Sequence, residues 1–282
     1  MKIWIEGCRP KTLIASVSPV LIGSVIAYNL GQFHGLFFAA SLLFALTVQI
    51  GTNFANDYID FLKGADTSER KGPRRLVQSG LVSPETMRKV TFGVFGTSAI
   101  IGLYLMWVGG WQIGVLALAA ILLGYLYTGG PYPLSYLGLG DIFVLIFFGP
   151  VAVAGVTYLQ TGSVLPIAIL AGFPPGLLSM AILSMNNIRD ELQDKKVGKK
   201  TLPVRFGQTF GKWEFALCIL FAAIIPLFQH TYLPSLATAF LGIPLTLKVF
   251  KANHAQEFAP LFPKVGMVQT IYTILFCIGW LF

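Results

Sequence analysis

Charged residues are scarce in this chain, and their scarcity indicates the class of protein. Only 11% of the 282 residues are Asp, Glu, Lys or Arg, whereas soluble domains carry about 25%. Hydrophobic residues make up 55%, and the mean hydropathy is +0.72. One soluble core cannot enclose so many apolar residues, so we predict an all-α integral membrane protein. No linker or low-complexity segment divides the sequence, and we therefore expect one membrane-embedded domain over residues 1–282.

Cysteine is also rare, which excludes two kinds of site. Cys8, Cys218 and Cys277 are odd in number and form no Cys-x-x-Cys pair. Neither a disulfide framework nor a zinc site is therefore predicted. A secretory signal pattern is missing as well, because the mixed segment 1–11 runs directly into a long apolar stretch.

Long apolar stretches are what the chain does contain. A helix that crosses a bilayer needs about 20 mostly apolar residues. We predict nine such spans, joined alternately by very short and by longer polar connections. The predicted spans are 12–28, 35–55, 90–108, 111–128, 141–159, 164–185, 213–228, 233–250 and 265–282.

The basic residues lie in four segments, and their positions predict an orientation. Three precede the first span, seven lie in 56–89, seven in 186–212, and three flank the connection before the ninth span. Nine spans place these segments, and all twelve acidic residues, on one face. Basic residues favour the cytoplasmic side, so we predict a cytoplasmic N-terminus. The net charge of +8 then indicates either contact with anionic lipid or attraction of an anionic substrate, not a nucleic-acid partner.

Two acidic clusters stand where apolar runs end. The first runs from Asn56 to Asp66 and the second from Asn186 to Asp194, and together with Glu69 they hold seven of the twelve acidic residues. Asn56 and Asp60 are one helical turn apart, as are Asp190 and Asp194, so each pair shares a helix face. Mg²⁺ prefers oxygen ligands and keeps coordination places for water and phosphate. Two facing helices with such pairs would hold a diphosphate through Mg²⁺.

Basic residues follow each cluster and suit the same ligand, because Arg and Lys bind phosphate oxygens. The alternative is a set of solvated surface ion pairs, which contribute about 0–1 kcal/mol each, and this is what we expect of Lys195 and Lys196. The residues concerned are Lys63, Arg70, Lys71, Arg74 and Arg75 after the first cluster and Lys195, Lys196, Lys199, Lys200 and Arg205 after the second.

Two further motifs lie on the predicted cytoplasmic face. The segment 9–12 opens the first span and either anchors the chain at the membrane interface or binds a carboxylate at the cavity mouth. The segment 125–134 ends the fourth span with Gly and Pro residues that break a helix. Its tyrosines would either face the cavity, where a ring stabilises a cation, or form an interfacial belt, which we expect of Tyr132 and Tyr136.

At these motifs the chain resembles the UbiA-type membrane prenyltransferases, and most of all the branch that prenylates 1,4-dihydroxy-2-naphthoate in menaquinone synthesis. The resemblance covers essentially the whole chain. It implies a nine-helix bundle around a central cavity, in the inner membrane of a bacterium. It rests on the opening CRPKTLIASVSPVLIGS and on NDYIDFLKGAD (56–66), GPRRLVQSGLVSP (72–84), YTGGPYPLSYLGLGD (127–141) and NNIRDELQDKKVGKKTLPVRFG (186–207).

The resemblance implies roles for individual residues. It implies Mg²⁺ held by Asn56, Asp60, Asp190 and Asp194, with Asp57 and Asp66 nearby. It further implies that Arg9 and Lys11 meet the aromatic acid and that Tyr127 lies near the reacting carbon. The residues assigned to the diphosphate are Lys63, Arg74, Arg75, Lys199 and Lys200.

We therefore predict transfer of a polyprenyl group from its diphosphate to an aromatic acid, with loss of CO₂ in the naphthoate branch. The alternatives are another acceptor (4-hydroxybenzoate, homogentisate, haem, a nucleoside-linked menaquinone precursor or glycerol phosphate), a transporter, or a non-catalytic scaffold of the quinone pathway. An acceptor panel and a flux assay separate them. Nothing in the sequence indicates tail length, the number of Mg²⁺ ions or oligomeric state.

Overall fold

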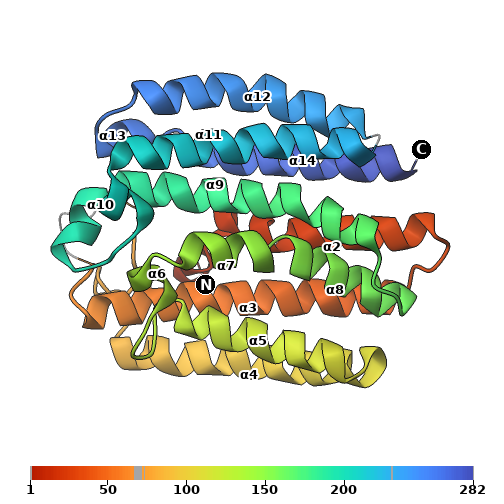
Figure 1. The fold of residues 1–282 in the computed structure, drawn as a ribbon. Coiled ribbons are helices and arrows are strands. Elements are labelled where there is room, and N and C mark those ends of the chain that lie inside the picture. The colour runs from red at the N-terminus through yellow and green to blue at the C-terminus, as the bar shows by residue number, and fades with distance from the viewer. Residues whose placement is uncertain (1, 67–71, 73, 230, 282) are drawn as a thin grey trace.

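The structure is a computed structural model that describes residues 2–66, 72, 74–229 and 231–281, and within these ranges it contains helices and no strand. The long helices run alongside one another (Figure 1). The elements are α1 (Lys2–Gly7), the 3₁₀ turn η1 (Pro10–Thr12), α2 (Ile14–Asn29), α3 (Gly35–Leu62), α4 (Pro84–Gly109), α5 (Trp111–Leu126), α6 (Leu134–Leu137), α7 (Gly140–Phe147), α8 (Pro150–Thr161), α9 (Pro166–Lys196), α10 (Leu202–Phe206), α11 (Gln208–Ile224), η2 (Ile225–Gln229), α12 (Tyr232–Lys251), α13 (Ala255–Phe258) and α14 (Phe262–Leu281).

The helices have the length and composition of membrane spans. Among the described residues, seven helices or helix pairs are long and apolar enough to cross a bilayer, or eight if the more strongly bent pair Ile3–Thr12 and Ile14–Asn29, bent by 55°, counts as one. The chain is thus an integral membrane protein. Each of the nine predicted stretches coincides with a helix or helix pair. The fourth, Trp111–Leu126, has only 16 residues, and the first, Ile14–Asn29, is equally short unless the bent segment Ile3–Thr12 is added to it. Nine spans therefore stay a prediction.

The two ends of the bundle differ in charge. We call the end at which α3 and α9 finish, and near which α6, α10 and α13 lie, the polar end (left in Figure 1). The connections at the opposite end include 30–34, 110 and 162–165, which contain no Asp, Glu, Lys or Arg. The fold thus gathers the charged segments at one end, as the sequence predicts.

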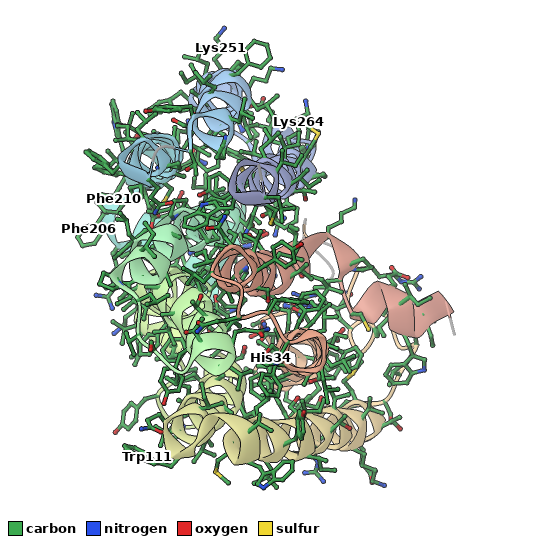
Figure 2. The ribbon with its side chains drawn as sticks, turned by 90° about the vertical axis from the view of Figure 1, so that its right-hand side faces the viewer. His34, Trp111, Phe206, Phe210, Lys251 and Lys264 are labelled. Carbon is green, nitrogen blue, oxygen red and sulfur yellow. The ribbon has the colours of Figure 1, made fainter. Side chains whose placement is uncertain are left out.

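Helix α9 lies at the centre of the packing. In its most apolar stretch 61% of the residues are buried, against 17% for α3. Its residues Leu178, Ile182 and Met185 belong to a buried cluster shared with α2, α11, α12 and α14. Seen along the helices, α4 and α5 form one side of the bundle, near Trp111, and α11, α12 and α14 form the other, with α2, α3 and α9 between them (Figure 2).

The fifth predicted span is broken in the middle, between α7 and α8. Phe148 and Gly149 form the break, and Gly149 and the first residue of α8, Pro150, lie directly against α9. A Cβ atom on Gly172 would stand 2.5 Å from Pro150 Cα, and one on Gly176 would stand 2.4 Å from the carbonyl oxygen of Leu145. Only glycine permits backbones to approach so closely. These glycines therefore seat the broken span on the central helix.

Candidate active site

An apolar cavity of about 330 Å³ opens between α2, α3, α5, α7, α8 and α9. Its size lies within the range of small-molecule sites, about 300–1,000 Å³. Leucine and phenylalanine side chains such as Leu116, Leu123 and Phe147 line its wall. Its polar lining toward the polar end comes from Arg9, Asn53, Asn56, Tyr127 and Asn186. The cavity suits a long hydrocarbon with a polar head.

A much smaller pocket of about 30 Å³ is lined almost wholly by polar groups. It is formed by Asp60, Ala65, Asp66, Arg75, Asp190, Gln193, Asp194 and Lys199. We call it the charged pocket.

The two pockets adjoin along two helices at once. On α3, Asn56 lines the apolar cavity and Asp60, one turn later, lines the charged pocket. On α9 the same step leads from Asn186 to Asp190. Residues four apart share a helix face. On both helices the lining of that face therefore changes from apolar to charged within one turn. The predicted pairing of the two acidic clusters is therefore present in the fold.

The carboxylates of the charged pocket are paired with basic side chains. The guanidinium of Arg75 lies 3.2 Å from Asp60 Oδ2 through Nη2 and 3.2 Å from Asp66 Oδ2 through Nε. Lys199 Nζ lies 3.3 Å from Asp60 Oδ2 and 3.9 Å from Asp194 Oδ1. Within the described ranges, no three acidic, His or Cys side chains converge closely enough to form a metal cluster. In this structure the basic groups stand among the carboxylates instead.

Asp190 is held differently from the other three acids. Both of its carboxylate oxygens accept hydrogen bonds from Arg189, at 2.7 Å from Nε and 2.6 Å from Nη2. The pocket lining thus contains four carboxylates but only two basic side chains, Arg75 and Lys199. Oxygen donors in excess over cations match the ligand chemistry of a hard divalent ion.

Arg75 retains unused hydrogen-bonding capacity inside the pocket. It is 5% exposed, and its Nη1 makes no hydrogen bond with any residue that the structure describes. A buried donor without a partner costs about 1–3 kcal/mol. Guanidinium groups bind phosphate oxygens in bidentate fashion. The free donor therefore marks a place for an anionic oxygen.

Tyr136 joins the charged pocket to the loop that follows α5. Its hydroxyl donates to Asp60 Oδ1 at 3.3 Å, and Lys63 and Lys199 stand 4.5 and 5.1 Å from the centre of its ring. The expectation of an interfacial position is wrong for this tyrosine, because α6 turns it inward, whereas Tyr132 is 76% exposed.

Burial and charge shift the pKa values of this group. Burial, and then the Asp60 carboxylate, raise the pKa of Tyr136. Burial lowers the pKa of Lys63. For Lys199 burial opposes the charged form, but Asp60 and Asp194 outweigh it and the pKa is raised. Lys199 and Tyr136 therefore both hold their protons beside Asp60.

The loop around Tyr127 is fixed by backbone contacts. The carbonyl of Tyr127 accepts from the amide and the hydroxyl of Ser135, at 3.0 and 2.7 Å. Thr128 donates its hydroxyl to Asn56 Oδ1, and the Thr128 carbonyl accepts from Lys63 Nζ at 2.7 Å. The Tyr127 side chain thereby lines the apolar cavity beside the first cluster.

Arg9 reaches the cavity through an unusual backbone conformation. Its φ of 52° is the left-handed region, which non-glycine residues seldom adopt. The carbonyl of Arg9 accepts from the amide and the hydroxyl of Thr12, both at 2.9 Å. This turn separates α1 from α2 and places Arg9 in the cavity lining.

The remaining predicted residues lie outside both pockets. Three of them are exposed and line neither pocket: Lys11, Arg74 and Lys200. Asp57, on α3, is buried but also lines neither pocket. Lys195 and Lys196 are exposed, as expected. Arg70 and Lys71 fall outside the described residues. Their predicted roles in binding are untested by these positions.

Sequence reasoning missed several polar residues near the site. Gln193 donates to the carbonyl of Ala65 at 2.8 Å and so ties α9 to the end of the first cluster. Asp141, 1% exposed, accepts from Asn187 at 3.3 Å, and Glu214 of α11 is buried against it. The sequence did contain a signal for Glu214, because it is the only charged residue in the apolar stretch 213–229.

Known proteins are similar to this sequence over nearly its whole length. A 1,4-dihydroxy-2-naphthoate octaprenyltransferase from Haemophilus influenzae is 36% identical, with 100% of this chain and 96% of that protein covered. Proteins of the same name from Bacillus subtilis and Mycobacterium tuberculosis are 33% and 31% identical, over 95% and 96% of this chain and 87% and 94% of theirs.

Solved structures share the fold. A UbiA homologue from Archaeoglobus fulgidus bound to GPP and Mg²⁺ superposes with a TM-score of 0.66 at 13% identity, covering 99% of both chains. A digeranylgeranylglyceryl phosphate synthase gives a TM-score of 0.63 at 17% identity, over 99% of this chain and 98% of that one. The sequence pattern of the UbiA prenyltransferase family matches residues 16–265. The chain, with its acidic clusters facing each other across one cavity, belongs to the UbiA prenyltransferase family.

Proposed function

We propose that this prenyltransferase moves a polyprenyl group from polyprenyl diphosphate to 1,4-dihydroxy-2-naphthoate, with release of diphosphate and CO₂ to give demethylmenaquinol. The observation that carries the proposal is the one-turn step, on both α3 and α9, from an apolar cavity to a charged pocket. A prenyl diphosphate has this polarity: a hydrocarbon tail joined to a multiply charged head. The naphthoate acceptor is supported by the names of relatives at 31–36% identity.

We propose Mg²⁺ as the cofactor, held by Asn56, Asp60, Asp190 and Asp194 with Asp66 close by. Bound there, the metal would neutralise charge on the departing diphosphate. The donor chemistry of the charged pocket supports this, as do fold relatives solved with Mg²⁺. Asp57 is left out of the ligand set, because its oxygens point to the backbone of another segment.

The chain's own residues would divide the work by position. Arg75 and Lys199 turn from their carboxylate partners to phosphate oxygens as the allylic C–O bond breaks and the diphosphate leaves with the bonding electrons. The apolar wall around Leu123 and Phe147 keeps water from the allylic cation. Tyr127 faces the same space, where its ring stabilises positive charge.

The acceptor enters on the Arg9 side of the cavity in this proposal. Arg9 lines the cavity and suits a carboxylate, which a guanidinium binds through paired hydrogen bonds. The electron-rich ring attacks the allylic carbon through the ring carbon that bears the carboxylate. The new C–C bond forms, CO₂ leaves, and the electrons of its bond restore the aromatic ring. Lys11 is exposed, so we propose for it a role in attracting the acid rather than in holding it.

The basic residues and the membrane orientation complete the proposal. Lys63, beside Tyr136, contacts the diphosphate, and the exposed Arg74 and Lys200 draw it toward the pocket. The charged pocket faces the cytoplasm of a bacterium, and residues 1–282 act as one domain.

The test is a reaction with purified protein, Mg²⁺, a polyprenyl diphosphate and dihydroxynaphthoate. We expect diphosphate, CO₂ and demethylmenaquinol, and a loss of activity of 10²-fold or more, on the order expected for groups that stabilise transition-state charge, in Asp60→Ala and Asp190→Ala. Glu85→Ala is the control, because its ion pair with Lys89 is exposed. Full activity in the double variant would contradict the metal assignment. Product from 4-hydroxybenzoate or homogentisate alone would replace the acceptor.

A further inference from the structure

Asp57 belongs to the first acidic cluster but serves a different part of the molecule. Its side chain is buried, at 3% exposure, and does not line either pocket. Its Oδ2 accepts from the amide of Leu76 at 2.9 Å and its Oδ1 from the amide of Val77 at 3.0 Å. Both carboxylate oxygens are thus directed at the connection between α3 and α4.

The two amides belong to the start of a tight turn. The amide of Ser79 donates to the carbonyl of Arg75 at 3.1 Å, so residues 75–79 form one helical turn. The first amides of such a turn have no partner within it. A side-chain oxygen usually caps them from the position just before the helix. Here Asp57 supplies that cap from α3, 19 and 20 residues earlier.

Apolar packing supports the same turn. Leu76 is 0% exposed and Val77 is 3% exposed, in a cluster with Phe54 and Tyr58 of α3. A Cβ atom on Gly7 would stand 2.8 Å from Leu76 Cδ1, so α1 also closes on this side chain. The turn is therefore held by two apolar side chains and by one carboxylate.

Arg75 is the residue that the turn orients. It directly precedes the two capped amides, and its carbonyl is the first acceptor of the turn. The peptide plane between Arg75 and Leu76 is rigid and includes the Cα atom of Arg75, so fixing the Leu76 amide also fixes the backbone point from which the Arg75 side chain departs. Its guanidinium then meets Asp60 and Asp66, with Nη1 left over inside the charged pocket.

We propose that Asp57 is a positioning residue: it caps the turn 75–79 and thereby aims Arg75 at the diphosphate. The assignment rests on the proposed function, since it gives Arg75 the diphosphate as its ligand. It differs from a metal-ligand role in its consequence. Loss of a metal ligand would act on Mg²⁺ binding directly, whereas loss of the cap acts only through Arg75.

The first measurement needs neither metal nor turnover. Hydrogen exchange of the peptide that covers 75–82 is followed in the metal-free protein, for the wild type and for Asp57→Asn. The asparagine has the same shape, but its amide group offers one acceptor oxygen where the carboxylate offers two. We expect faster exchange at Leu76 or Val77 in the variant and unchanged exchange within α9.

The second measurement is binding of inorganic pyrophosphate with Mg²⁺. We expect Asp57→Ala to weaken it about tenfold, the effect of losing contacts made by one charged group, and Asp57→Asn to fall between. Arg75→Ala should weaken it by at least as much. In the Arg75→Ala background, Asp57→Ala should cause no further loss, because residues that act through one another are not additive.

A control separates positioning from general damage. Phe276→Leu opens a hole in the other large apolar cluster, which α14 shares with α2, α9, α11 and α12 and where Phe276 is 0% exposed. We expect it to lower Tm at least as much as Asp57→Asn while pyrophosphate binding stays at the wild-type value. If Asp57→Asn lowers Tm but leaves binding and the 75–82 exchange unchanged, the positioning role is overturned.

The remaining outcomes are also decisive. Equal losses from Asp57→Ala in both backgrounds would overturn the route through Arg75 and restore Asp57 as an independent ligand. If the wild-type protein binds no pyrophosphate in the presence of Mg²⁺, the proposed function fails and this assignment fails with it. If Asp57→Ala weakens pyrophosphate binding in the wild-type background but causes no further loss in the Arg75→Ala background, both the proposed function and the positioning role are supported.

Discussion

The two neighbouring acids of the first cluster, Asp57 and Asp60, contact different parts of the molecule. Asp60 is the centre of the charged pocket, since Arg75, Lys199 and Tyr136 all contact it. Asp57, three residues earlier on α3, faces the connection to α4 instead. Asp57 and Asp60 are three residues, or about 300° of helix rotation, apart, so Asp57 points about 60° away from Asp60. Neighbouring acids in one motif thus have different partners.

Tyr136 offers a prediction about pH. Burial and Asp60 raise its pKa above the ordinary 10.0, and the pKa of Lys199 is raised as well. The folded protein therefore keeps protons that the unfolded chain releases, so stability falls as the pH rises beyond about 10. We expect Tm to fall more steeply between pH 9 and 11 in the wild type than in Tyr136→Phe. Tyr132→Phe, at an exposed ring, should follow the wild-type curve.

The acidic pairs could be predicted from spacing alone, but their partners could not. Asn56 and Asp60 lie one turn apart, and helix periodicity places them on one face. Tyr136, which contacts Asp60, comes from another part of the chain, and Gln193 of the second cluster contacts Ala65 of the first. Both contacts arise from how α6 and α9 dock. A tyrosine in an amphipathic loop suits the interface equally well. Only the tertiary arrangement distinguishes the two positions.

At the scale of elements, the broken span and the central helix form one unit. The break at Phe148 and Gly149 ends α7 beside the cavity, and Phe147 and Phe148 line the cavity wall. Glycines on α9 allow this close approach. The end of α7, which forms part of the cavity wall, is therefore held in place by backbone contacts with α9.

This contact predicts a sharp effect of one methyl group. Gly172→Ala would place Cβ within 2.5 Å of Pro150 Cα and 2.8 Å of the Gly149 carbonyl carbon. We expect a loss of about 1–3 kcal/mol, as for other overpacked sites, measured as a lower Tm in detergent. Gly96→Ala is the matched control. No atom lies within 4 Å of its Cβ position in α4, so the change should be neutral or stabilising by about 0.5–1 kcal/mol.

The spans themselves could be predicted from the sequence more completely than the connections. All nine apolar stretches fall on helices, because length and hydropathy decide where a chain crosses a bilayer. The break at Gly149 was not predicted, since a Gly-Pro pair within 22 apolar residues leaves the run uninterrupted in composition. The turn at 75–79 was also unpredicted, as its cap comes from α3 rather than from a neighbouring residue.

At the scale of the whole molecule, the apolar cavity and the charged pocket are separate sites with different linings. This separation predicts that the two can be disturbed independently. Ala120 of α5 lines the apolar cavity, and Ala120→Trp should fill it. We expect a raised KM for a polyprenyl diphosphate with unchanged binding of Mg²⁺ and pyrophosphate. Leu118→Trp, on the same helix but 58% exposed, should leave both unchanged. Equal loss of pyrophosphate binding in Ala120→Trp would mean that the pockets act as one.

The distribution of charge predicts how the molecule lies in the membrane. In a variant without the three native cysteines, Lys195→Cys and Ser163→Cys report the polar and the opposite end, and both positions are exposed. With the polar end in the cytoplasm, a membrane-impermeant maleimide should label Ser163→Cys in intact cells. It should label Lys195→Cys only after permeabilisation. The reverse pattern would contradict the proposed orientation.

The basic side chains already seated among the acids have a consequence for the order in which ligands arrive. Free Mg²⁺ entering the charged pocket would have to draw Asp60 away from Arg75 and Lys199. Each of these cations would then keep one carboxylate partner instead of two, Asp66 for Arg75 and Asp194 for Lys199, and weakening buried ion pairs in this way is costly. A preformed complex of Mg²⁺ with the substrate brings its own anionic oxygens to both. We therefore expect metal affinity to be weak in the resting protein and strong once substrate is present, so that the ion and the head group are captured together.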